Sequence, residues 1–210
     1  MFITQLLTVA AVHLLAVMSP GPDFAMVTRN SLIYSRKIAI YTSLGIALGI
    51  SIHVAYSLLG IGFVISKSIL LFSIIKYIGA AYLLYIGYKS LRAKPDKLSS
   101  QENAVIATKN ISARSALWTG FLTNVLNPKA TLFFLALFTQ VIDPHTPKSI
   151  QLFYGFEMMF ITFVWFSIVA FLFSNSLIKA KVTKFQHYIE RVTGAVLIGL
   201  GIKVALSSHK

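Results

Sequence analysis

The sequence predicts an all-α membrane protein with six transmembrane helices. They form two inverted three-helix repeats, and helices one and four are broken at proline. Three observations predict this fold: an apolar composition, six long apolar runs, and prolines in the middle of two of those runs. The 210 residues are 56% hydrophobic and only 12% charged, with a mean hydropathy of +0.75. Because a soluble domain carries about 25% charged residues, this composition excludes a water-soluble globule.

Each apolar run has the length that a bilayer requires, about 20 residues per helix. The runs are Phe2–Val27, Ile38–Ile65, Ser68–Tyr88, Ala116–Val141, Ile150–Phe173 and Tyr188–Leu206. The longest polar stretch, about residues 93–114, is expected to be a cytosolic linker. We therefore expect a single transmembrane domain over 1–210, with repeat 1 at about 1–92 and repeat 2 at about 115–210.

The basic residues predict how the chain is oriented. It carries 19 Lys and Arg against 6 Asp and Glu, and 13 of the 19 follow the first, third and fifth runs. Positive loops remain in the cytoplasm, so both termini are expected outside. Since these charges lie in short loops between apolar runs, they indicate membrane topology rather than nucleic-acid binding. The chain has no cysteine and no clustered histidine, so we expect no metal site and no cofactor.

The two halves of the sequence resemble each other. Residues 79–89 align with residues 193–203 at a shift of 114, which pairs Ala81 with Ala195 and Gly87 with Gly201. Ser19-Pro20 aligns with Asn127-Pro128 at a shift of 108. With three helices in each half, the second copy enters the membrane upside down. Inverted repeats of this kind are typical of transporters, with the site where the copies meet.

Segments one and four each contain proline in mid-run, where it removes a backbone donor. A capping residue precedes each proline, Ser19 before Pro20 and Asn127 before Pro128. Such a pair is typical of a helix start. We therefore expect each segment to break and restart, so that two helix N-termini converge at a similar depth and attract an anion. The alternative is a pair of packing kinks unrelated to a ligand.

Charged residues lie beside both predicted breaks. Ser19, Pro20, Gly21, Pro22 and Asp23 form the first candidate site segment, and Asn127, Pro128 and Lys129 form the second. An ionised side chain within the membrane is costly, so each needs a reason. Asp23 is a candidate to bind a substrate ammonium or to carry protons, or else it is a helix-start carboxylate near the cytosolic edge. Lys129 is expected to reinforce carboxylate binding, to pair with Asp23, or to reach toward an interface.

Two further residues are candidates for proton coupling together with Asp23. Glu157 lies near the centre of the fifth run, and its alternative role is an idle acid in an outer vestibule. His53 extends the stripe Gly45, Gly49, His53 at four-residue spacing. Because glycines permit close helix approach, we expect His53 to face a partner helix, with proton relay as the second interpretation.

These motifs resemble those of the amino-acid efflux proteins of the lysine-exporter superfamily. The resemblance rests on Met18-Ser19-Pro20-Gly21-Pro22-Asp23-Phe24 and on Leu126–Phe134, with further similarity at Leu44–Gly49 and Gly79–Gly87. Within the superfamily the chain is most similar to the homoserine/threonine efflux branch, especially over His13–Lys37.

The resemblance implies a bacterial inner-membrane exporter of small neutral amino acids that is driven by protons and forms a homo-oligomer. It also implies that Ser19–Asp23 and Asn127–Lys129 are functional segments. The alternatives are export of basic amino acids, export of another small solute, and a passive channel. An enzyme is not expected, because Asp23, Glu157 and His53 show no recognised catalytic spacing.

Overall fold

The computed structural model describes residues 2–67, 69–92, 111–140, 146–174, 188, 191–199, 201–202 and 205–206. The elements in these residues are α-helices, and none of the described residues is in a strand. The described part of the chain is therefore all-helical. Residues 93–110 of the predicted linker, and parts of the sixth apolar run, lie outside the described residues.

The first apolar run is a bent pair of helices, as predicted. Helix α1 spans Phe2–Met18 and α2 spans Pro22–Ile33, with a bend of 59° between them. The restart, however, lies at Pro22 rather than Pro20, and its N-cap is Gly21 rather than Ser19. The helical conformation is sterically disfavoured for a residue that precedes proline. Gly21 accordingly has an extended backbone (φ −174°), and the helix restarts at Pro22.

The fourth apolar run contains the second bent pair. Helix α5 (Ala113–Val125) begins after Ser112, whose side chain accepts a hydrogen bond from the Ser115 amide. Helix α6 (Pro128–Gln140) follows with a bend of 57°. Here the predicted cap is confirmed, because Asn127 Oδ1 accepts from the Lys129 amide at 3.0 Å and Pro128 is the first helical residue.

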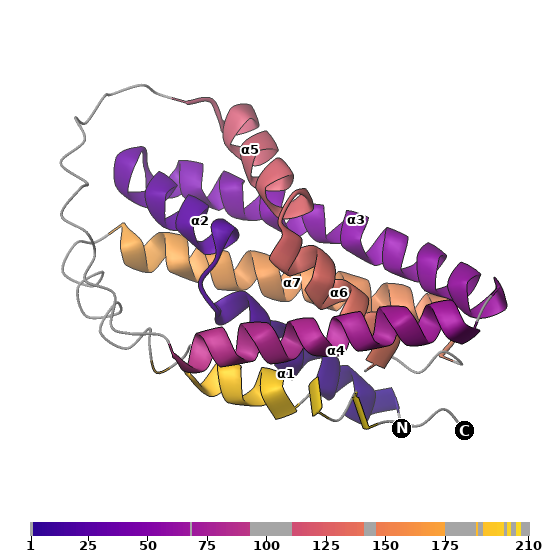
Figure 1. Cartoon of the computed structure of the whole chain (residues 1–210). Coiled ribbons are helices and arrows are strands. Elements are labelled where there is room, and N and C mark those ends of the chain that lie inside the picture. Colours follow the sequence, from indigo (N-terminus) through magenta and orange to yellow (C-terminus); the bar gives the residue numbers. More distant parts are fainter. Residues whose placement is uncertain are drawn as a thin grey trace.

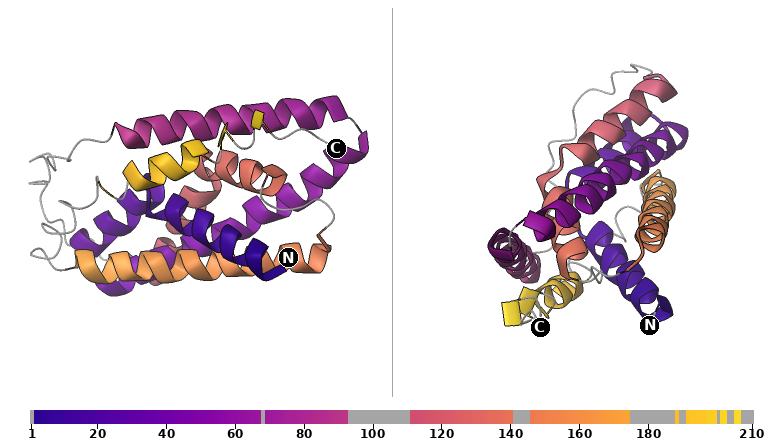
Figure 2. Two further views of the ribbon diagram at one scale, coloured as in Figure 1. Left: turned by 90° about the horizontal axis from the view of Figure 1, so that it is seen from below. Right: turned by 90° about the vertical axis from the view of Figure 1, so that its right-hand side faces the viewer.

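Three long helices run along the molecule: α3 (Arg36–Lys67), α4 (Ile69–Leu91) and α7 (Lys148–Phe173). Figure 2 shows parts of both bent pairs between α4 and α7 in its left-hand view. Helix α7 and the part of α3 over Arg36–Leu59 are long and apolar enough to cross a membrane, and each bent pair adds a further span if it is taken as one. The chain is thus a multi-pass membrane protein, with two to four candidate spans in its described part.

Several helix ends lie together at each of the two ends of the molecule (Figure 1). In Figure 1 the last turns of α2, α4 and α7 and the first turns of α3 and α5 all lie toward the left of the molecule. The first turns of α4 and α7 lie at the opposite end.

Glycine brings α3 and α5 into direct contact. A methyl group added at Gly45 would overlap the Leu117 carbonyl, and one added at Gly120 would overlap the Thr42 carbonyl. The predicted close approach at Gly45 and Gly49 is therefore confirmed, since Gly49 packs in the same way against the Asn124 side chain. This contact positions the break between α5 and α6 beside the middle of α3.

Two apolar clusters fill the described part of the bundle. One contains Val9, Ile50, Phe134, Tyr154 and Met158, together with other residues of α1, α3, α4, α6 and α7. The other contains Val27, Ile46, Phe166 and Phe173, among others. The two helix breaks lie between these clusters, where buried polar residues gather.

Candidate functional site

The two breaks meet in the interior, and each supplies the hydrogen-bond partners of the other. Asp23, in the first turn of α2, is only 8% exposed. Its Oδ2 accepts hydrogen bonds from Asn124 Nδ2 at 2.9 Å and from Asn127 Nδ2 at 3.2 Å. Two amides from the second half of the chain therefore stabilise the ionised carboxylate from the first half.

Lys129 makes the reciprocal contact from α6 to α1. Its Nζ donates to the backbone carbonyls of Ser19 at 2.8 Å, Ala16 at 3.3 Å and Pro20 at 3.4 Å. These carbonyls lie at the C-terminal end of α1, where the helix dipole and the unpaired acceptors attract a cation. The Lys129 ammonium thus caps α1, which explains how a charged lysine is stabilised at this depth.

A small cavity lies beside the breaks. Ser19, Gly21, Asp23, Asn127 and Lys129 of the predicted site all line it. The remaining lining residues come from four neighbouring segments: His13, Ala16, Val17, Phe24, Ile50, Asn124, Ala130, Phe133, Phe134 and Phe166.

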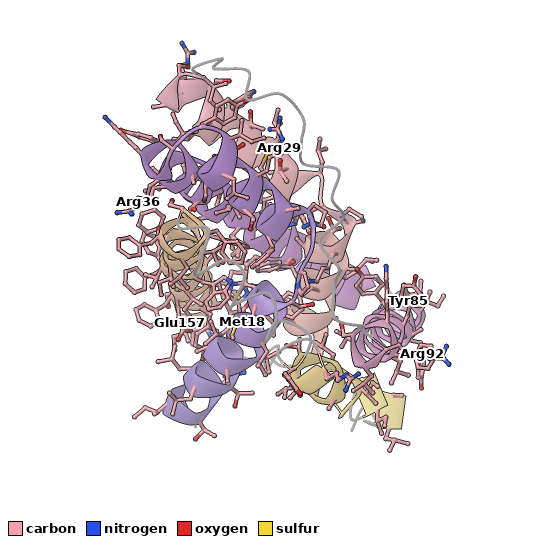
Figure 3. All side chains as sticks on the ribbon, turned by 90° about the vertical axis from the view of Figure 1, so that its left-hand side faces the viewer. Met18, Arg29, Arg36, Tyr85, Arg92 and Glu157 are labelled. Carbon is pink, nitrogen blue, oxygen red and sulfur yellow. The ribbon has the colours of Figure 1, made fainter. Side chains whose placement is uncertain are left out.

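The prolines of the predicted site face a different space. Pro20, Pro22 and Pro128 line a groove between the breaks and α4, and do not line the cavity. Helix α4 contributes Tyr82, Tyr85, Tyr88, Lys89, Ser90 and Arg92 to this groove. Figure 3 labels Tyr85 and Arg92 on α4. Ser19, Gly21, Asn127 and Lys129 line both spaces, so the breaks separate the groove from the cavity.

His53 lies outside the cavity lining, on the partner-facing side of α3 as predicted. Its Nε2 is 3.0 Å from the Asn124 carbonyl, and its Nδ1 is 2.8 Å from the Tyr56 hydroxyl. The ring also stacks on Phe134 with 5.3 Å between centroids. His53 therefore holds α5 and α6 in place around the break.

Glu157 is also outside the cavity lining. It lies on α7, and its Oε2 is buried without a hydrogen-bond partner among the described residues. The structure thus brings Asp23 together with the two breaks. The other two candidate proton carriers do not line the cavity, although His53 contacts the lining residues Asn124 and Phe134.

Among the lining residues that were not predicted as site residues, two have polar side chains, Asn124 and His13. Asn124 binds Asp23 through its side chain and His53 through its carbonyl. The sequence feature that could have identified Asn124 is its amide side chain within an apolar run, three residues before Asn127. His13 is buried on α1 and hydrogen-bonded to α7. His13 could have been identified in the same way, as a polar residue within a long apolar run.

Asp23 Oδ1 is one of three unpartnered acceptors among the described residues of the cavity lining, together with His13 Nδ1 and Asn124 Oδ1. It is buried and has no hydrogen-bond partner among the described residues, whereas Oδ2 has two. A carboxylate oxygen in this state attracts a cationic donor such as an ammonium. The aromatic rings of Phe133, Phe134 and Phe166 line the same cavity and suit the apolar part of a small amphipathic solute.

Comparison with known proteins adds a family and several relatives. The family model described as LysE type translocator matches residues 14–208. A threonine efflux protein of Escherichia coli (strain K12) is 35% identical over 205 residues, which cover 96% of this chain and 97% of that protein. The threonine efflux protein of Salmonella typhimurium is 34% identical over 203 residues, which cover 95% of this chain and 97% of that protein.

An uncharacterized membrane protein of Bacillus subtilis, YrhP, is 33% identical over 208 residues, covering 97% of this chain and 99% of that protein. No solved structure matches the chain.

Proposed function

We propose that this chain, which belongs to the LysE type translocator family, exports small neutral amino acids such as threonine or homoserine in exchange for protons. The observation that carries the proposal is the buried Asp23 carboxylate, which offers one open oxygen to a cavity between two helix breaks. Two relatives named threonine efflux proteins match nearly the whole chain and support the substrate class.

The proposed architecture is a six-span inverted repeat within one domain over 1–210, and three features support it. The two bends are nearly equal, at 59° and 57°. The breaks also contact each other across the halves, as counterparts about a two-fold axis should. The third feature is the packing of α4 against the helical residues 191–199 and 201–202.

That packing repeats itself under the sequence shift of 114. A Cβ at Gly87 would meet Gly194 and Ile198, and a Cβ at Gly201 would meet Ala80 and Leu84. The shift pairs Ala80 with Gly194, Leu84 with Ile198 and Gly87 with Gly201. The contacts of Gly87 are therefore equivalent to those of Gly201 with the two halves exchanged. This is the pattern expected of two antiparallel copies related by a two-fold axis.

The proposed location is the bacterial inner membrane, with both termini outside. The grouping of helix ends supports this orientation, because Arg29, Arg36 and Arg92 belong to the end where α2 and α4 finish and α3 begins. Positive residues at one end of the bundle favour the cytoplasmic side. A homo-oligomer remains a prediction from the family resemblance.

In the proposed mechanism, Asp23 Oδ1 binds the substrate ammonium. The substrate carboxylate is placed at the uncapped start of α2, where no side chain accepts from the backbone amides. Proton binding to Asp23 removes the charge that holds the ammonium, and so links proton entry to substrate release. Rocking of the two repeats about the breaks then exposes the cavity to alternate sides.

Asp23 is the proposed proton carrier rather than Glu157 or His53. It is the one acidic residue among those that line the cavity, so a proton and an ammonium compete for the same group. This single acid also favours a neutral amino acid over a basic one, because a basic side chain would need a second carboxylate. Export of basic amino acids or of another solute, and passive conduction, are the alternatives.

Transport by the purified protein in proteoliposomes tests the proposal. With unlabelled threonine inside, we expect uptake of labelled threonine that homoserine and serine compete with and lysine does not. With an imposed pH gradient, threonine should accumulate against its own gradient, and an uncoupler should abolish the accumulation. Flux that only equilibrates threonine would indicate a channel, and competition by lysine would indicate a basic amino-acid exporter.

A further inference from the structure

His13 carries an acceptor that the proposed mechanism does not use. The side chain is 2% exposed, and its Nε2 lies 3.2 Å from the Met158 carbonyl and 2.9 Å from Thr162 Oγ1 on α7. A carbonyl oxygen only accepts hydrogen bonds, so Nε2 carries the proton in the neutral ring. Nδ1 then has a lone pair and needs a donor.

No described residue supplies that donor. Nδ1 is buried and unpartnered, and His13 lines the same cavity as Asp23. The ring is held in place by Phe133 and Phe134, with centroid distances of 5.9 and 5.7 Å. Because buried acceptors are nearly always satisfied, a fixed and open one at a cavity indicates a ligand donor.

We propose that His13 Nδ1 accepts the side-chain hydroxyl of the substrate, and so makes this exporter selective for hydroxy amino acids. This inference rests on the proposed function, in which Asp23 binds the ammonium. The charged substrate ammonium binds the Asp23 carboxylate, and the neutral His13 imidazole suits a neutral donor such as a hydroxyl. Phe133 and Phe134, whose rings contact His13, offer the hydroxyl no acceptor. Asn124 Oδ1 is a further unpartnered acceptor in the cavity lining.

His13 and Asp23 line the same cavity from the two sides of the first break. His13 lies in α1, and Asp23 lies in the first turn of α2. In this proposal, one small molecule with an ammonium and a hydroxyl contacts both acceptors. A substrate without the hydroxyl would leave Nδ1 unsatisfied, which is the basis of discrimination.

The test compares threonine with 2-aminobutyrate, which lacks only the hydroxyl, as competitors of labelled threonine counterflow. We expect the wild type to prefer threonine about tenfold or more. His13→Gln keeps a donor toward Met158 but loses the acceptor at Nδ1, so this preference should fall to about one. His13→Asn places an amide oxygen near the Nδ1 position and should restore part of it.

Thr162→Val is the matched control, since it changes a neighbour of Nε2 and leaves Nδ1 untouched. Its threonine preference should equal that of the wild type. Equal competition by the two amino acids in the wild type overturns the inference whatever the variants do, as does an unchanged preference in His13→Gln. A wild type that transports no neutral amino acid contradicts the proposed function itself, which is a different result.

Discussion

Replacement of Asp23 by asparagine is expected to lower threonine export about 100-fold while the protein remains folded in the membrane. The substitution keeps the size of the side chain and removes its charge. A hydrogen bond to a charged group contributes about 1.5 to 3 kcal/mol, which corresponds to about ten- to 150-fold in binding. Loss of proton exchange adds to this effect, because asparagine does not titrate. Initial rates in proteoliposomes, at matched protein content, measure the change.

Glu157→Gln is the matched control for this experiment. It also replaces an acid by its amide, but Glu157 lies on α7 outside the cavity lining. We expect this variant to keep most of the wild-type rate and its dependence on the pH gradient. If Asp23→Asn retained gradient-driven export while Glu157→Gln lost it, Glu157 and not Asp23 would be the proton carrier.

Replacement of Gly45 by alanine is expected to prevent stable packing of α3 on α5. A methyl group at this position would overlap the Leu117 carbonyl, which belongs to a helix backbone and cannot turn aside. Overpacking typically costs about 1 to 3 kcal/mol, and backbone overlap lies at or above the upper end. We expect a strongly lowered thermal unfolding temperature in detergent and a loss of monodisperse protein on size-exclusion chromatography.

Gly199→Ala provides the control, since a Cβ there meets nothing within 4 Å. Alanine is the better helix former by about 1 kcal/mol, so this variant should be as stable as the wild type or slightly more. Equal unfolding temperatures for the two variants would show that α3 and α5 are not in close contact in the membrane.

The helix breaks were predictable because proline and asparagine act locally. Asn127-Pro128 starts α6 as the sequence indicates, since the cap needs only the neighbouring amide. The first restart was placed two residues early, at Pro20. Both Ser19-Pro20 and Gly21-Pro22 fit a helix start, and the deciding fact is that the helical conformation is disfavoured for Gly21 before Pro22.

The apolar runs predicted where the helices lie, but the first run is shorter than the helices that it contains. The run Phe2–Val27 stops short of Ile33, where α2 ends. Helix α2 continues through polar residues that find partners: Asn30 donates to Thr42 of α3, and Ser31 donates to the Val27 carbonyl of α2 itself. The contact of Asn30 depends on a neighbouring helix, so hydropathy alone does not reveal it.

The polar partners inside the site were the least predictable part. Asp23 was recognisable as a costly intramembrane acid. That Asn124 would bind it depends on the bend that returns α5 and α6 toward α2, and on the glycines that bring α5 close to α3. His13 similarly depends on the position of α7. Local patterns predict helices and breaks, whereas contacts between distant segments follow from their packing.

Protection of a single thiol by substrate tests the central claim that the breaks form the transport site. The chain has no cysteine, so Gly21→Cys introduces one reactive group into the cavity lining. The nearest atom to a Cβ there is Lys129 Cδ at 3.5 Å, so the change fits. We expect threonine to slow modification of this thiol by a water-soluble reagent, and not to slow that of Lys37→Cys at the exposed start of α3. Equal rates with and without threonine, in protein that transports it, would contradict the account.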